Sequence, residues 1–310
     1  MSIIERLADL LGPVVHPQQK PAEAGDVADT PDPGLIERAV NDGGPQPDVP
    51  RDDGLEAQSQ TRARSARPKG TVNGILRIDP DRLRRQNIIT PDGERTQVAE
   101  SFRRIKRHVL GNLGDSEPGT SANLVMVTSP LAGEGKTFCS INLAISIAME
   151  MDRTVLLVDA DVAKPLIPAV LGVEAKRGLM DVLLDRNIDL AHVLRKTDID
   201  TLTLLPAGTG HRNATELLAS EMMRQLLQAM ASRYHDRIII FDSPPLLVAS
   251  EAAVLANRMG QIIMVVEAGK TTATALKVAL GRIESSKNVG LLLNKGQASG
   301  LSYYYGGYGV

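Results

Sequence analysis

The stretch SPLAGEGKT, residues 129–137, contains glycines and side chains that could bind the phosphate groups of a nucleotide. Gly133 and Gly135 allow the backbone to turn tightly and to bring its N–H groups close to an anion. Lys136 can reach the β- and γ-phosphates, and the Thr137 hydroxyl can bind Mg²⁺. The pattern GxxxxGK[ST] ends intact, although a proline replaces its first glycine. The stretch therefore predicts an ATP–Mg²⁺ site, with nucleotide contacts from Ala132, Gly133, Glu134, Gly135, Lys136 and Thr137.

Three aspartates follow apolar runs downstream of this loop. Asp159 and Asp161 end the run LLVDAD, and Asp242 ends the run IIIFD. Residues two apart in an extended chain point the same way, so Asp159 and Asp161 can both face the triphosphate. Aspartates at such positions hold Mg²⁺ in phosphate-loop enzymes, and a further carboxylate can take a proton from an attacking hydroxyl. A single aspartate there could equally cap a helix, but three of them favour a catalytic site.

The last eight residues, YYYGGYGV, contain four of the chain's five tyrosines. The glycines between them cannot form a rigid element. A tail that carries phenol hydroxyls in a chain with a triphosphate site suggests a phosphoryl acceptor. The alternative is an aromatic tail used for binding or stacking. The predicted acceptors are Tyr303, Tyr304, Tyr305 and Tyr308.

These residues need a scaffold that brings them together, and from residue 123 onward strand and helix patterns alternate. Strands are predicted at 124–127, 154–158, 202–205, 237–241, 261–266 and 290–293. Most of these segments are short continuous apolar runs, which is typical of strands buried on both faces. Apolar residues at helical spacing predict helices at 94–110, 136–149, 214–233, 250–258 and 273–285. The alternation predicts an α/β fold, a doubly wound, mostly parallel sheet of P-loop NTPase type with helices on both faces. Ligands of such sheets bind at the carboxyl ends of the strands, where the three aspartates fall.

The residues before this domain differ in composition from the rest of the chain. Residues 1–12 predict a short amphipathic helix, with a disordered end as an almost equal alternative, and residues 13–75 predict a disordered linker. The basic region 62–107 lacks interleaved aromatics, so a solvated surface is favoured over a nucleic-acid site. The net charge is −2, there is one cysteine, and no apolar run approaches the roughly 20 residues of a membrane span. We therefore expect a cytoplasmic protein with no disulfide within the chain and no nucleic-acid partner.

Three motifs and the tail resemble, in the same order, those of the bacterial tyrosine kinases, which use a P-loop. SPLAGEGKT resembles their Walker A motif, LLVDAD their second acidic motif and IIIFDSPP their Walker B motif. The stretches MSIIERL, ESFRRIKRHVL and LPAGTGHRNATELLAS resemble the autokinases of exopolysaccharide loci associated with exosortase. The resemblance implies a kinase domain over residues 76–300 and a tyrosine-rich tail over residues 301–310.

The resemblance also implies a role for each motif residue. Lys136 and Thr137 bind ATP–Mg²⁺, and Asp159 helps to activate the incoming tyrosine. Asp161 lies near the metal, and Asp242 completes the Mg²⁺ site. Asn294, which Lys295 follows, resembles an adenine-recognition position. The implied catalytic residues are Lys136, Asp159 and Asp161, and the implied metal ligands are Thr137, Asp161 and Asp242.

The family's oligomerisation motif, Glu-x-x-Arg-x-x-Arg, corresponds here to Glu100, Arg103 and Lys106. Lysine in the last position lacks the bidentate fork of arginine. The resemblance implies a ring homo-oligomer in which each tail is phosphorylated by a neighbouring subunit. It further implies a membrane chain-length regulator that supplies a cytoplasmic activating segment and recruits the kinase to the inner face of the membrane. A phosphotyrosine phosphatase would complete a cycle that controls exopolysaccharide synthesis and export.

Two other classes of protein remain open at this point. A partitioning or cell-division ATPase of the same superfold would carry a signature lysine at the position of Leu131. The second class is a non-catalytic or slowly hydrolysing ATP-binding scaffold. The intact Lys136 and the three aspartates disfavour a dead site, and formation of phosphotyrosine would distinguish the kinase from both alternatives.

Overall fold

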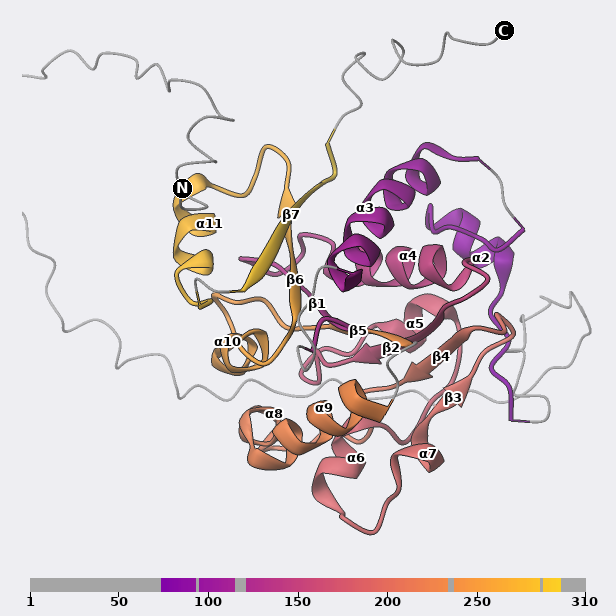
Figure 1. Ribbon diagram of the computed structural model, residues 1–310, viewed down its shortest axis with the longest axis vertical. Helices are drawn as coiled ribbons and strands as arrows, with labels where there is room; N and C mark the ends of the chain where they lie inside the picture. The colour runs from indigo at the N-terminus through magenta and orange to yellow at the C-terminus, as the bar shows by residue number, and fades with distance from the viewer. Residues whose placement is uncertain (1–73, 93–94, 115–120, 234–236, 285–286, 297–310) are drawn as a thin grey trace, which may run out of the picture. The chain divides into compact units, whose positions relative to one another are not determined.

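The computed structural model describes residues 74–92, 95–114, 121–233, 237–284 and 287–296 (Figure 1). All of them belong to one of the two units into which the chain divides, Arg64–Val310. The predicted N-terminal helix, nearly all of the predicted linker and the tyrosine-rich tail lie outside the described residues. None of the described helices is long and apolar enough to cross a membrane.

A seven-stranded sheet forms the centre of the described fold, in the order β3-β4-β2-β5-β1-β6-β7. Neighbouring strands are parallel, except for the short β3, which is antiparallel to β4. The predicted mostly parallel sheet is therefore confirmed. The strands are β1 (Leu124–Thr128), β2 (Thr154–Asp159), β3 (Arg195–Lys196), β4 (Leu202–Leu205), β5 (Arg237–Asp242), β6 (Gln261–Glu267) and β7 (Asn288–Asn294).

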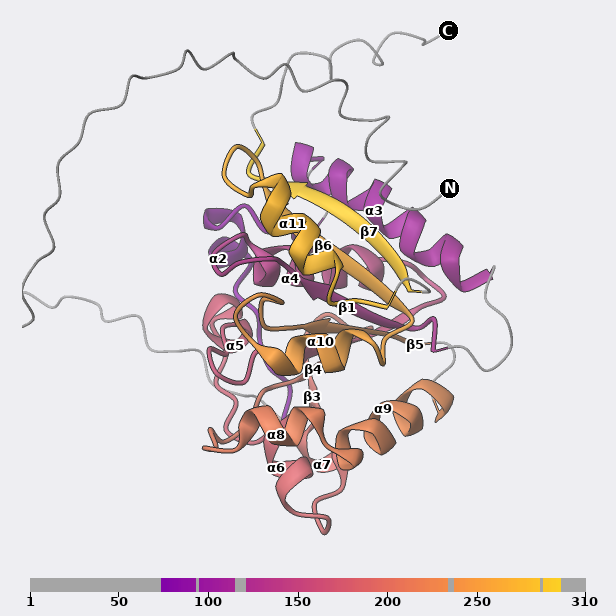
Figure 2. The ribbon, with the colours of Figure 1, turned by 90° about the vertical axis from the view of Figure 1, so that its left-hand side faces the viewer.

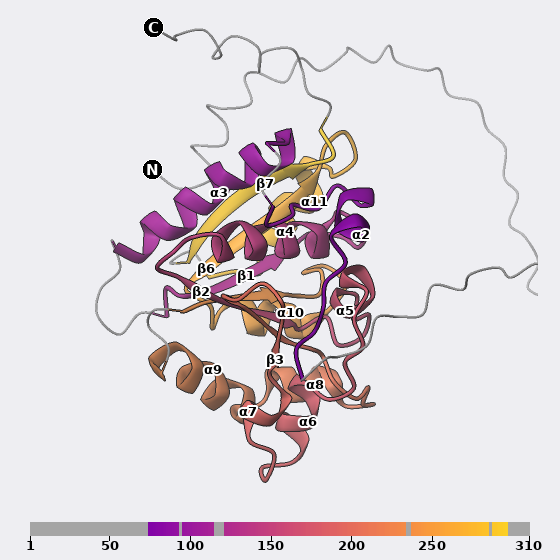
Figure 3. The same ribbon diagram turned by 90° about the vertical axis from the view of Figure 1, so that its right-hand side faces the viewer.

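Helices cover both faces of the sheet, and alternate strand residues fill two hydrophobic cores (Figures 2 and 3). Val125 and Val127 of β1 point into the first core, whereas Leu124 and Met126 point into the second. Such two-sided burial explains why the strands read as continuous apolar runs. The first face carries α2 (Pro80–Arg85), α3 (Gln97–Gly114), α4 (Lys136–Ala148) and α5 (Ile167–Leu171). The second carries α6 (Leu179–Leu184), α7 (Leu190–Val193), α8 (Ala214–Ala219), α9 (Glu221–Arg233), α10 (Ser250–Ala256) and α11 (Ala273–Leu280).

Helix α4 is enclosed between the sheet and α3, and nearly all of its side chains are buried. The Phe102 ring of α3 meets the Phe138 ring of α4 edge-on, with centroids 6.2 Å apart. Edge-to-face contact is a favourable aromatic geometry. This packing fixes the helix that begins directly after the phosphate-binding loop.

The segment 74–90, here called the N-terminal strap, joins several elements of the domain. Its Leu76 N–H donates to Lys196 O of β3 at 2.8 Å. Helix α2 within it contacts the end of α5, where the Arg82 side chain donates to two backbone carbonyls. Further along, Ile89 N–H donates to the buried Asn142 side chain of α4 at 2.9 Å. The strap therefore links the sheet edge to both helices that follow the site's motifs.

The predicted strand positions are confirmed, but β7 is largely exposed and not buried on both faces. Three of the predicted helices differ from the structure, and the one expected at 273–285 ends at Leu280. The helix expected at 214–233 is two helices, because Ser220 leaves the helical region (φ −69°, ψ 164°). Its Oγ accepts from the Met223 N–H, as N-cap side chains do at the start of a helix. The helix expected at 94–110 begins at Gln97 and continues to Gly114.

Candidate nucleotide-binding and active site

The phosphate-binding loop connects the end of β1 to the start of α4, as predicted. Gly133 and Gly135 have φ values of 85° and 98°, a left-handed conformation that residues with a side chain rarely adopt. A Cβ added to Gly135 would lie 2.0 Å from Asn294 Nδ2, so a side chain at position 135 would displace the Asn294 amide. The α4 N-terminus then points at the loop, where its dipole favours an anion.

Lys136 and Asp161 lie on opposite sides of the same site and interact. The Lys136 side chain is buried, and its Nζ lies 4.0 Å from Asp161 Oδ2. Burial raises the pKa of Asp161, although the positive charge of Lys136 opposes the rise. Because Asp161 keeps some solvent exposure, it stands at the edge of the site, where a ligand can reach both groups.

Asp159 and Asp242 lie directly opposite each other at the ends of the adjacent strands β2 and β5, and both are fully buried. Asp159 Oδ2 accepts from the Ile167 N–H at 3.1 Å, and Asp242 Oδ1 accepts from the Ser140 hydroxyl at 3.1 Å. Burial and repulsion by Asp242 raise the pKa of Asp159 to about 8. Burial also raises the pKa of Asp242 to about 6, while a hydrogen bond from Thr137 limits that rise.

One oxygen of each of these two carboxyl groups, Asp159 Oδ1 and Asp242 Oδ2, is buried without a hydrogen-bond partner. Buried carboxylate oxygens without donors are suited to a cation, and Mg²⁺ takes one or two carboxylates together with phosphate oxygens. Across the described ranges, no group of three or more His, Cys, Asp or Glu residues could hold a metal on its own. The residues therefore fit a Mg²⁺ ion that nucleotide phosphates and the Thr137 hydroxyl help to coordinate.

A second set of contacts supports the loop from the ends of β6 and β7. The nearly fully buried Glu134 carboxylate accepts from the Leu131 N–H at 2.8 Å and from the Thr271 hydroxyl. The Asn294 amide donates to Glu134 O at 2.9 Å, and Lys295 Nζ donates to Gly133 O at 2.7 Å. Asn294, expected at the adenine, thus contacts the loop backbone in this structure. Thr271 carried no signal in the sequence, because only the sheet register brings it to the loop.

Sequence reasoning also missed Glu251, in the first turn of α10. Its side chain is buried, and its negative charge contributes to the raised pKa of Asp161. Within the described part of the chain, Glu251 has no hydrogen bond and no ion pair. It adds a further acid beside Asp161.

The three residues expected at an oligomer interface do not share one environment. Glu100 and Arg103 form an exposed ion pair of 2.6 Å on α3. Lys106 is buried, donates to Ser146 O at 3.2 Å and pairs with Glu150. The structure therefore places Lys106 against α4 of its own subunit, and leaves the exposed pair for contacts outside it.

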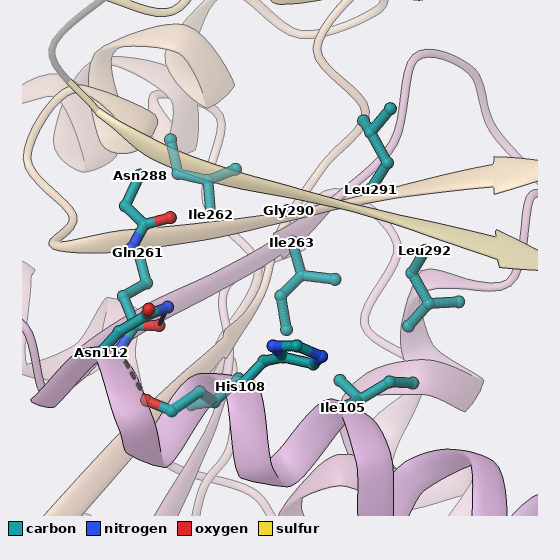
Figure 4. Close-up of a pocket in the computed structure, with 11 residues that line it drawn as sticks. Ile105, His108, Asn112, Gln261, Ile262, Ile263, Asn288, Gly290, Leu291 and Leu292 are labelled. Atoms are coloured by element: carbon teal, nitrogen blue, oxygen red, sulfur yellow. Dashed lines mark hydrogen bonds between the residues drawn. The ribbon is translucent and has the colours of Figure 1, made fainter. Parts of the chain in front are cut away.

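A cavity of about 140 Å³ lies between α3 and strands β6 and β7 (Figure 4). Asn112 and Gln261 close one end of it, and their side-chain amides are hydrogen-bonded at 2.8 Å. Gln261 and Asn288 are the first residues of their strands. The cavity therefore starts at the amino ends of the strands and is separate from the nucleotide site.

The parallel sheet, the loop between β1 and α4 and the aspartates at the strand ends define a P-loop nucleotide-binding protein. A family model described as "AAA domain" matches residues 123–290. The chain is 31% identical over 228 residues to tyrosine-protein kinase YwqD of Bacillus subtilis (strain 168), a match that covers 73% of this chain and 92% of that relative.

Further matches agree with this relationship. Putative tyrosine-protein kinase EpsB of Ralstonia nicotianae is 31% identical, but the match covers 70% of this chain and only 28% of that longer relative. The kinase domain of Escherichia coli tyrosine kinase ETK superposes with a TM-score of 0.56 at 25% identity, covering 73% of this chain and 99% of that chain. The chain belongs to the family of bacterial tyrosine-protein kinases, as its motifs predicted.

Proposed function

We propose that the protein is an ATP-dependent tyrosine autokinase that phosphorylates its own tyrosine-rich tail. The observation that carries the proposal is the meeting of Lys136 with three carboxylates at the phosphate-binding loop, two of them with unpartnered buried oxygens. A tail with four tyrosines provides the acceptor: Tyr303, Tyr304, Tyr305 and Tyr308.

In the proposed reaction, the tyrosine Oη forms a bond to the γ-phosphorus of ATP, and the bond from that phosphorus to the β,γ-bridging oxygen breaks. Bound Mg²⁺ would neutralise developing phosphate charge. The Lys136 side chain would exchange its ion pair with Asp161 for contacts with the β- and γ-phosphates. The ionised form of Asp159 would accept the phenol proton, because burial makes its carboxylate a stronger base than one in water. Asp242 would accept a hydrogen bond from the Thr137 side chain and help to hold the metal.

We propose that the transfer occurs in trans within a ring. Glu100 and Arg103 are exposed on α3 and can pair with a neighbouring subunit. Tyr303 follows Lys295 by eight residues. At about 3.3–3.6 Å per extended residue, Tyr303 reaches at most about 30 Å from Lys295 and Tyr308 about 45 Å. A neighbour's site must therefore lie within these distances of the end of β7.

The cellular setting is proposed from the family resemblance. The kinase would act at the inner face of the membrane, where a chain-length regulator supplies the activating segment. A phosphotyrosine phosphatase would reverse the modification, and the cycle would control exopolysaccharide synthesis and export. Each phosphorylated tyrosine adds roughly −1.5 to −2 charges, so repulsion between tails would loosen the ring. Identical sedimentation of fully phosphorylated and dephosphorylated protein would contradict that last step.

Intact mass spectrometry after incubation with Mg-ATP tests the kinase proposal. The full chain is expected to gain phosphate on the tail, whereas Lys136→Met is expected to gain none. A variant with all four tail tyrosines changed to phenylalanine separates tail phosphorylation from other sites. Mixing that variant with Lys136→Met tests transfer in trans, because only the inactive subunit then carries acceptors.

The experiment also tests the alternative function, a non-catalytic or slowly hydrolysing ATP-binding scaffold of the partitioning type. The site favours a kinase, because Lys136 and all three aspartates are in place. A sample with an activating segment from a candidate membrane partner is run in parallel. If ATP binds but no phosphate is added even with that segment, the scaffold becomes the better interpretation.

A further inference from the structure

Lys295, the first residue after β7, has a backbone conformation that is unusual for its type. Its φ is 58°, in the left-handed region that disfavours residues with a Cβ. Its Nζ donates to Gly133 O at 2.7 Å and lies 3.1 Å from Glu267 Oε2 at the end of β6. The side chain therefore spans from the end of the sheet to the phosphate-binding loop.

The neighbouring residue makes a parallel contact with the next carbonyl of the loop. The side-chain Nδ2 of Asn294 donates to Glu134 O at 2.9 Å, and the backbone carbonyl of Asn294 accepts from the Ala268 N–H. Two successive loop carbonyls, those of Gly133 and Glu134, are thus held by two successive side chains of the β7 end.

Fixing these carbonyls also fixes the N–H groups of the same peptide units. In a planar trans peptide, the C=O of one residue and the N–H of the next point in opposite directions. If Gly133 O points toward Lys295, the Glu134 N–H points away from it, and the Gly135 N–H likewise points away from Asn294. Among the described residues, neither N–H has a hydrogen-bond acceptor. Both are therefore available to phosphate oxygens.

We propose that Lys295 is a positioning residue, which orients the loop peptide 133–134 for phosphate binding and is itself held by Glu267. A charged donor is stronger than a neutral one, so Lys295 contributes more than an amide in its place. This role concerns ATP binding and does not depend on which group receives the phosphate. It deepens the proposed function at the same site.

Lys270 provides a matched control for a test of this role. Its Nζ lies 3.3 Å from the same Glu267 oxygen, but among the described residues it makes no hydrogen bond to the loop. Lys295→Met and Lys270→Met therefore remove the same charge beside the same acid. Lys295→Arg keeps the charge and tests rescue, and Glu267→Gln removes the acid that holds Lys295.

The affinity for Mg-ATP is measured by calorimetry on the full chain, and the KM and kcat for ATP by tail phosphorylation. Lys295→Met is expected to raise the Kd and KM about five- to tenfold while kcat at saturating ATP stays near wild type. Glu267→Gln should raise the Kd about two- to threefold, and Lys270→Met should stay within about twofold. Lys295→Arg should recover most of the affinity.

Two results would overturn the inference. One is a wild-type Kd in Lys295→Met; the other is an equal loss in Lys270→Met, which would indicate a general charge effect. Thermal melting without nucleotide tests whether Lys295→Met folds. If it does not fold, the inference is tested by comparing the Kd for Mg-ATP of Glu267→Gln with that of Lys270→Met, and equal values overturn it. Absence of tail phosphorylation in the wild-type protein, even with an activating segment, would refute the proposed function, while the Kd values would still test Lys295.

Discussion

Replacing Asp159 by asparagine is expected to stabilise the nucleotide-free protein while abolishing phosphoryl transfer. Folding raises the pKa of Asp159 from 3.8 to about 8, chiefly through burial and then through repulsion by Asp242. Ionisation of this carboxyl therefore favours the unfolded chain. The resulting loss in the free energy of unfolding is absent well below pH 3.8, grows as the pH rises above 3.8, and levels off above about pH 8.

The size of this effect follows from the two pKa values. At pH 7, the unfolded group lies about 3.2 pH units above its own pKa, whereas the folded group remains mostly protonated. At about 1.4 kcal/mol per unit, the destabilisation approaches about 4 kcal/mol at pH 7 and about 1.6 kcal/mol at pH 5. An asparagine cannot ionise, and its Oδ1 can still accept from the Ile167 N–H. We expect Asp159→Asn to gain about 2–4 kcal/mol at pH 7.

Urea denaturation between pH 5 and pH 8 in the presence of EDTA measures this gain. Asp181→Asn serves as a control for which the opposite change in stability is expected. Partial burial would raise the pKa of Asp181, but hydrogen bonds from Gly178 and Thr209 lower it below its ordinary value. Asp181→Asn should therefore lose stability at neutral pH. If Asp159→Asn is less stable than wild type at pH 7, or its advantage does not grow from pH 5 to pH 8, the reasoning is wrong.

Four further substitutions concern the phosphate-binding loop, helix α3 and the N-terminal strap. Gly135→Ala should weaken ATP binding about tenfold or more in a nucleotide titration, because its φ is 98° and an added Cβ would meet Asn294; unchanged affinity would contradict that contact. Lys106→Met should lower the free energy of unfolding by about 1–3 kcal/mol in urea, because it removes a buried charge-assisted bond to α4. Arg103→Ala should leave the free energy of unfolding unaltered and lower the sedimentation coefficient if the proposed ring forms through the exposed pair. Arg82→Ala should lower the free energy of unfolding by about 1–2 kcal/mol in urea, because Ala169 O loses its bond from Arg82 and Val170 O keeps only the one from Gln86. Wild-type stability would show that the two Arg82 bonds contribute nothing measurable to holding α5.

The sheet and the motif residues could be predicted, because each rests on a local pattern. Continuous apolar runs marked the strands, and the glycines with Lys136 marked the loop between β1 and α4. Local patterns also explain the error at Ser220, where helical spacing continues although the backbone leaves the helical region. Strands as short as Arg195–Lys196 carry too few residues for any period to be recognised.

The supporting contacts of the site could not be predicted from local patterns. Lys295 and Thr271 reach the loop only because β6 and β7 continue the parallel register beside β1. The raised pKa of Asp159 likewise depends on Asp242, which the register places directly opposite on another strand. Lys106 fits a motif for subunit contact, yet α3 packs against α4 so that the Lys106 side chain bonds to Ser146 O within the same subunit.

The position of β1 in the sheet has a consequence for the synthesis of the protein. Leu124 of β1 pairs with Ile239 on one side, and Val125 pairs with Gln261 on the other. Both partner strands leave the ribosome long after β1 and the apolar helix α4, and pairing over such separations is slow. A nascent chain thus exposes its most apolar segments until β5 and β6 emerge. It cannot form the pair of opposed aspartates before β5 has emerged, so the nucleotide site forms only after that strand is available.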